Sequence, residues 1–162
     1  MEFKKLANNT IKFGINRIIE VLALCIIIVG VLLLISLASF SPDDPNFIFP
    51  DNTTIKNFLG FRGSVTSDLF FQSFGLIALL IPFSLIISGI NIFLNKKIFL
   101  IIESIFYTVI YTLFGSLFFS FFYSVTFDLY INGNGGFIGK YLETTFLTSI
   151  ININLQISYY LL

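Results

Sequence analysis

Glu103 is the carboxylate whose position in this sequence could support proton or ion movement. It follows Lys97 by six residues, which is roughly 9 Å along a helix axis. A carboxylate at that depth in a bilayer is costly unless it is paired or hydrated. Glu103 is therefore either part of a proton or ion relay or an interfacial group paired with Arg17 or a turn lysine. Proton-coupled transport usually needs several such carboxylates near the midplane of the membrane. Glu20, one turn after Arg17, predicts a local i,i+3 ion pair.

Few other residues could bind a metal or carry out redox chemistry. The chain has one cysteine, Cys25, and no histidine, so an intrachain disulfide is impossible and a Cys/His metal site is not expected. Cys25 lies in an apolar run, where a thiol is inert packing. Asp43, Asp44 and Asp51 lack the ligand spacing of a calcium loop. We find no paired nucleophile and base and no phosphate-cradling loop, and predict no metal, no cofactor and no enzyme chemistry in this chain.

Composition and apolar runs indicate a membrane protein. The 162 residues are 56% hydrophobic and 11% charged, whereas a soluble domain carries about 25% charged residues. The predicted fold is an all-α integral membrane domain with four transmembrane helices, because about 20 apolar residues span a bilayer. The predicted spans follow a basic segment at 1–20 and lie at about 21–40, 69–94, 98–127 and 141–162.

The basic residues predict the orientation of these spans. Cytoplasmic loops are enriched in Lys and Arg, and six of the nine basic residues lie in the N-terminal segment and in the turn after the second span. The connections at about 41–68 and 128–140 hold the other three, together with five aspartates. Both termini are therefore predicted to be cytoplasmic and these two loops periplasmic.

Pro82 lies near the middle of the second predicted span. A proline at that point removes one intrahelical hydrogen bond and frees the carbonyl of Ala78, so we expect a kink. In a membrane, the freed carbonyl must find another donor on a neighbouring helix or hydroxyl. The second span is therefore predicted to lie inside a bundle.

Small residues repeat at four-residue intervals on the second and third predicted spans. Such stripes allow helices to approach closely in lipid. They could pack within one chain or between copies, and we favour packing within the chain. The candidate packing residues are Ser84 and Ser88 with Gly89, and Ser116, Ser120 and Ser124 with Gly115.

Four short motifs occur in a fixed order along the chain. They are SFSPDDP at 39–45, NFLGFRG at 57–63, FG at 74–75 with LLIP at 79–82, and GGFIG at 135–139. In this order and spacing the chain, over about residues 17 to 162, resembles the amino-terminal membrane domain of the FtsK/SpoIIIE DNA translocases. The sequence departs from that pattern at Arg62, where an apolar or small residue is expected, and at Asn152, Asn154 and Gln156 of the last span.

The resemblance implies a four-span domain of the bacterial inner membrane, located at the division septum. In that family the domain anchors a cytoplasmic hexameric ATPase that pumps chromosomal DNA, and it contacts other division proteins. This sequence contains no Walker motif, so oligomerisation and DNA contact are expected only through a motor elsewhere in a longer protein. The alternative is a small transporter or channel subunit, with Glu103 and the asparagines of the last span lining a path.

Overall fold

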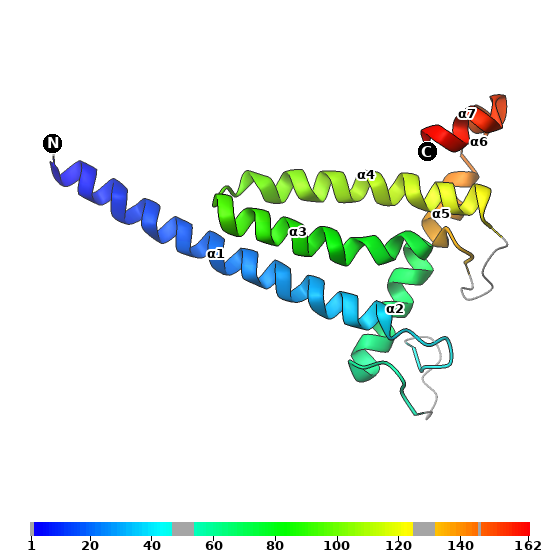
Figure 1. Cartoon of the computed structure of the whole chain (residues 1–162), viewed down its shortest axis with the longest axis horizontal. Helices are drawn as coiled ribbons and strands as arrows, with labels where there is room; N and C mark the ends of the chain where they lie inside the picture. The colour runs from blue at the N-terminus through cyan, green and yellow to red at the C-terminus, as the bar shows by residue number, and fades with distance from the viewer. Residues whose placement is uncertain (1, 47–53, 125–131, 146) are drawn as a thin grey trace.

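The computed structural model describes residues 2–46, 54–124, 132–145 and 147–162, and within these ranges the chain is helical, without a strand. Three long helices lie side by side, with shorter helices gathered at one end of them (Figure 1). The helices are α1 (Glu2–Ala38), α2 (Gly60–Phe74), the 3₁₀ helix η1 (Gly75–Leu79), α3 (Leu80–Asn95), α4 (Phe99–Phe122), α5 (Gly136–Glu143), α6 (Leu147–Ile153) and α7 (Leu155–Leu161).

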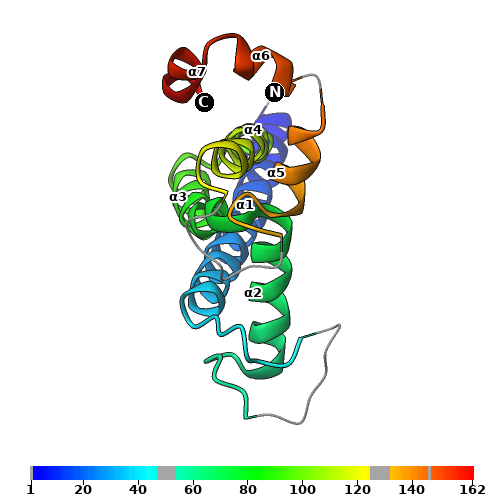
Figure 2. The same cartoon turned by 90° about the vertical axis from the view of Figure 1, so that its right-hand side faces the viewer.

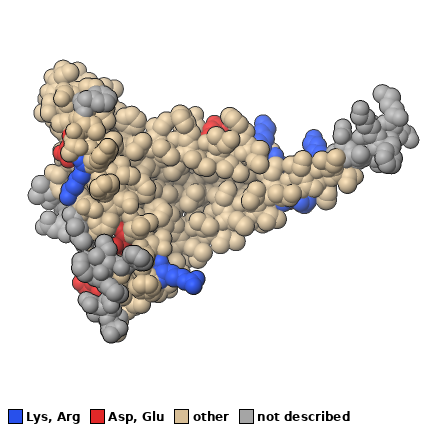
Figure 3. Space-filling view, turned by 180° about the vertical axis from the view of Figure 1, so that it is seen from behind, with Lys and Arg blue, Asp and Glu red and all other residues tan. Residues whose placement is uncertain are grey.

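The long helices form a bundle in which α3 packs against both α1 and α4. Ala23 and Ile92 are fully buried where α1 meets α3, and Leu33 and Ile81 belong to a second buried cluster nearer α2. The outer faces of the same helices remain apolar and exposed, and charged side chains gather mainly toward the two ends (Figure 3). An apolar surface of this extent needs lipid or another protein to cover it.

Among the described residues, three helical stretches are long and apolar enough to cross a membrane: Asn9–Ala38, Gly60–Asn95 and Phe99–Phe122. The first and third overlap the predicted spans at 21–40 and 98–127, although α1 begins far earlier and α4 ends at Phe122. The middle stretch contains the predicted span at 69–94 but is not straight.

The middle stretch bends at Gly75, seven residues before Pro82, where the sequence predicts a kink. Helix α2 is seen side-on in Figure 2, where α1, α3 and α4 are viewed nearly end-on, so α2 lies across the end of the bundle. Gly75 has φ 69° and ψ −146°, a conformation open essentially to glycine alone. Pro82 is the third residue of α3, and a missing N–H in the first turn of a helix costs little. Together η1 and α3 are roughly 34 Å long, enough to cross the hydrocarbon core.

The segment predicted as a fourth span, at 141–162, does not form one helix in the structure. It contains the end of α5 and the separate seven-residue helices α6 and α7, none of which is long enough to cross a bilayer. Asn154 separates α6 from α7: its backbone is extended, and its side-chain oxygen accepts a hydrogen bond from the N–H of Ile157 at 3.2 Å. This contact is an N-cap, which favours the start of a new helix over continuation of the old one.

Candidate functional site

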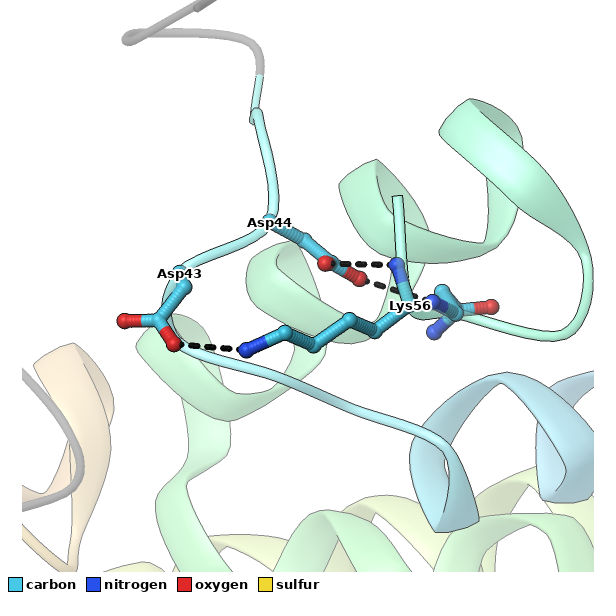
Figure 4. A network of polar contacts seen from close by, with 4 residues as sticks. Asp43, Asp44 and Lys56 are labelled. Atoms are coloured by element: carbon cyan, nitrogen blue, oxygen red, sulfur yellow. Dashed lines mark hydrogen bonds and ion pairs between the residues drawn. The ribbon is translucent and has the colours of Figure 1, made fainter. Parts of the chain in front are cut away.

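The motifs at 39–45 and 57–63 meet at the end of α1. Asp44 is 6% exposed, and its carboxylate accepts hydrogen bonds from the backbone N–H groups of Lys56 and Asn57, both at 2.8 Å (Figure 4). The ammonium group of Lys56 reaches Asp43 at 2.8 Å on the exposed side of the same loop. The two acidic residues of the motif therefore bind the segment that leads into α2, Asp44 through the backbone of that segment and Asp43 through the Lys56 side chain. We call this arrangement the first junction.

Asn57 connects the first junction to the last turns of α1. Its amide nitrogen donates to the backbone oxygens of Ser36, at 2.9 Å, and Ser39, at 3.3 Å. These carbonyls lie at the C-terminal end of the helix, where intrahelical donors run out. The Ser36 hydroxyl in turn donates to the Gly63 carbonyl at 2.7 Å. A β-carbon at Gly63 would overlap the side-chain oxygen of Asn57, so the glycine is needed for this close approach.

The ion pair between Asp43 and Lys56 has a definite pH dependence. The Lys56 hydrogen bond lowers the pKa of Asp43, and the same contact raises the pKa of Lys56. The stabilisation linked to Asp43 is therefore present above the ordinary aspartate pKa and lost as pH falls through the lowered one. The part linked to Lys56 is present below the ordinary lysine pKa and lost as pH rises through the raised one. Because both groups are exposed, we expect this contribution to be small.

The GGFIG motif meets the bend at Gly75, in what we call the second junction. The N–H of Leu76 donates to the carbonyl of Asn134 at 2.9 Å, and the Ser116 hydroxyl donates to the carbonyl of Phe74 at 3.0 Å. A β-carbon at Gly75 would overlap the Asn134 carbonyl oxygen, and one at Gly139 would overlap the backbone of α4. The second junction thus joins α2, α4 and α5 through direct backbone contact.

The amino-terminal stripe of small residues lies on α3. A β-carbon at Gly89 would come within 2.5 Å of the Ile27 side chain, so Gly89 allows α1 and α3 to approach closely. The hydroxyls of Ser84 and Tyr111 are 2.8 Å apart and join α3 to α4. Ser88 lines a groove of about 270 Å³ between the long helices.

The second stripe lies on α4 and serves the second junction. A β-carbon at Gly115 would come within 2.5 Å of Ile77 in η1. The Ser116 hydroxyl donates to the Phe74 carbonyl, as described above. The Ser120 hydroxyl donates to the Glu143 carboxylate at 2.8 Å. Ser124 is exposed at the end of α4.

Comparison with known families matches this chain to the model of the 4TM region of DNA translocase FtsK/SpoIIIE over residues 16–157. The chain belongs to this family. Proteins named DNA translocase FtsK are similar to it in Rickettsia typhi (34% identity over 84 residues, 50% of this chain and 11% of that protein) and in Rickettsia prowazekii (35% over 82 residues, 49% and 11%). This chain thus spans about a tenth of the length of these relatives. No solved structure matches it.

The acidic residues of this FtsK/SpoIIIE membrane region are not arranged as a relay in the part of the chain that is described. Glu103 is exposed on α4 and has no ion pair there. Arg17 and Lys96, which the sequence offered as its partners, both bind Glu20 instead. Lys96 lies 2.6 Å from Glu20 and has a left-handed backbone, φ 54°, at the end of α3. The predicted pair of Arg17 and Glu20 is present. No pattern in the sequence predicts the contact between α1 and the α3–α4 turn.

In the described portion of this FtsK/SpoIIIE chain, no three His, Cys, Asp or Glu side chains lie close enough to share a metal ion. Asp51, considered above as a calcium ligand, is outside the described residues. Cys25 is exposed on α1 and not in apolar protein packing as predicted, because this face of the helix points away from the bundle. The two junctions fix the helix positions through hydrogen bonds between α1, α2, α4 and the segment before α5.

Proposed function

We propose that this chain is the membrane-anchoring and assembly domain of a DNA translocase that acts in chromosome segregation at the division septum of the bacterial inner membrane. The observation that carries the proposal is the family match over residues 16–157. The motor is proposed to lie elsewhere in the full-length protein, and to be the part that contacts DNA and forms the oligomer. Other membrane proteins of the division site are the proposed partners.

The way in which the bundle is tied at both ends also supports an anchor. At one end, Glu20 of α1 binds Lys96 of the α3–α4 turn. At the other end, the first junction fixes α2 to α1, and the second fixes α2 to α4 and α5. An anchor must resist the pull of its motor, whereas alternating access in a transporter requires one part of a bundle to move against another.

The proposed orientation places the N-terminus and the α3–α4 turn in the cytoplasm and both junctions in the periplasm. Lys96 and Lys97 in the turn, and the basic N-terminal segment, support it. Reporter fusions after Asp51 and within residues 128–136 should therefore score as periplasmic, and a fusion after Lys97 as cytoplasmic. A cytoplasmic score for the Asp51 fusion would contradict the arrangement. Fusions beyond residue 162 report whether the C-terminal segment crosses the membrane.

The assembly role can be tested in the full-length protein by replacing residues 16–157 with an unrelated four-span anchor. We expect the replacement to stay in the membrane but to lose septal placement, and cells carrying it to form filaments. Glu103→Gln is the matched control, because an anchor does not need this charge; it should divide as wild type does. Normal division with the replaced segment would rule out an assembly role.

The transporter alternative predicts the opposite behaviour for Glu103. If this carboxylate carries protons or ions, reconstituted wild-type protein should show a flux that disappears in Glu103→Gln. The anchor proposal predicts that flux through wild-type liposomes equals that through empty ones. A flux dependent on Glu103 would overturn the proposed function.

A further inference from the structure

An apolar groove of about 470 Å³ runs along the outside of the bundle and ends at α2. Its volume lies within the roughly 300–1,000 Å³ typical of small-molecule sites. Val29 and Leu32 of α1 form one wall, and Leu85 of α3 contributes to the other. Arg62 and Thr66 of α2 stand at its end.

The walls of this groove are surfaces that lipid acyl chains reach. Val29 and Leu32 are 55% and 46% exposed and lie within the long apolar stretch of α1. Arg62 belongs to the first turn of α2, and α2 lies across the end of the bundle (Figure 2). A residue beyond the ends of long apolar helices lies near the level of the lipid headgroups. The groove therefore runs from the hydrocarbon region to the level of phosphate groups.

Arg62 is the charged residue among those that line this groove. It is exposed, and no carboxylate of the described residues forms an ion pair with it. A guanidinium binds phosphate oxygens with two parallel hydrogen bonds, which makes it a strong phosphate ligand. The apolar walls favour a phosphate that carries acyl chains over inorganic phosphate.

We propose that this groove binds one membrane phospholipid, with its phosphodiester on Arg62 and an acyl chain against Val29 and Leu32. The proposal depends on the membrane location of the chain and not on its septal role. A lipid in this position would fill the angle between α1 and α2 that protein side chains leave open. It would also give Arg62, an unexpected residue at this point of the motif, a specific ligand.

The test titrates phosphatidylglycerol into the full-length protein in detergent and counts bound lipids by native mass spectrometry. Wild type should retain one lipid more tightly than the rest. Arg62→Gln should weaken that binding about tenfold, the effect of losing one charge-assisted contact. Lys97→Gln, which removes an exposed cation at the opposite end of the bundle, should leave it unchanged.

A second pair of variants tests the apolar part of the groove. Leu32→Trp should block the acyl chain and weaken retention, whereas Leu24→Trp, at a position equally exposed on α1 but outside the groove, should not. Excess inorganic phosphate should fail to displace the lipid. Retention equal to wild type in both Arg62→Gln and Leu32→Trp would overturn the proposal and leave the groove to a protein helix. Displacement by phosphate would reduce it to an anion site.

Discussion

Gly75→Ala is expected to destabilise the folded domain by about 4 kcal/mol, within the range that only severe backbone or core changes reach. Gly75 has φ 69° and ψ −146°, where an alanine is strained whatever its surroundings. The added methyl group would also overlap the carbonyl oxygen of Asn134 and lie 2.7 Å from the carbonyl carbon of Gly135. Both are backbone atoms, which cannot rotate away. The second junction must therefore separate, and with it the hydrogen bond from Leu76 to Asn134.

Gly60→Ala is the matched control, because Gly60 has nearly the same φ, 65°, but nothing lies within 4 Å of its β-carbon position. It should cost only the backbone strain, about 1 kcal/mol. The measurement is reversible unfolding of the full-length protein in detergent micelles, followed by the helical signal of the membrane region. Equal losses in the two variants would mean that strain alone matters and that the contact with Asn134 is not formed.

The long helices could be predicted from the sequence because apolar length is a sufficient signal for them. The bend at Gly75 could not, since the apolar run from Leu69 to Leu94 reads the same whether the helix is straight or turned. Pro82 predicts a kink because proline generally breaks or bends a helix. In the structure a new helix starts at Leu80, two residues before the proline, and the glycine makes the turn.

In the C-terminal segment, apolar length predicts a long helix that the described residues of the segment do not form. Its apolar composition predicted a fourth span, but the local contacts of Asn154 and of the threonines before α6 end each helix after about two turns. Side chains that bond to nearby backbone compete directly with helix continuation. The apolar composition of a segment therefore does not predict whether it forms short capped helices or one helix that spans the bilayer.

The motifs were visible in the sequence, but their pairing was not. Nothing in the order of SFSPDDP and NFLGFRG indicates that Asp44 would accept hydrogen bonds from Lys56 and Asn57, or that Gly75 would touch Asn134. These contacts join residues that are far apart in the sequence, and they depend on the conformation of the loops between them. The ion pair of Glu20 and Lys96 is equally non-local, so the sequence alone does not distinguish Glu20 from Glu103 as the partner of Lys96.

Asp44→Ala is expected to destabilise the domain by about 3 kcal/mol. The substitution leaves the buried N–H of Asn57 and the partly buried N–H of Lys56 without their acceptor. An unsatisfied buried group costs about 1–3 kcal/mol. Loss of this anchor should also release Asn57 from the end of α1 and let α2 move relative to the bundle. Thermal unfolding in detergent measures the loss of stability, and a spin-label distance between α1 and α2 measures the movement.

Asp43→Ala is the control for Asp44→Ala, because it removes an equal charge from the adjacent position of the same loop. The Asp43 carboxylate is 78% exposed and binds only the side chain of Lys56 among the described contacts, so water replaces it and the effect should be small. If general charge in this loop stabilised the domain, the two variants would behave alike and both effects would fall with added salt. If the first junction depends on buried backbone hydrogen bonds, only Asp44→Ala should be severe, and salt should not change it.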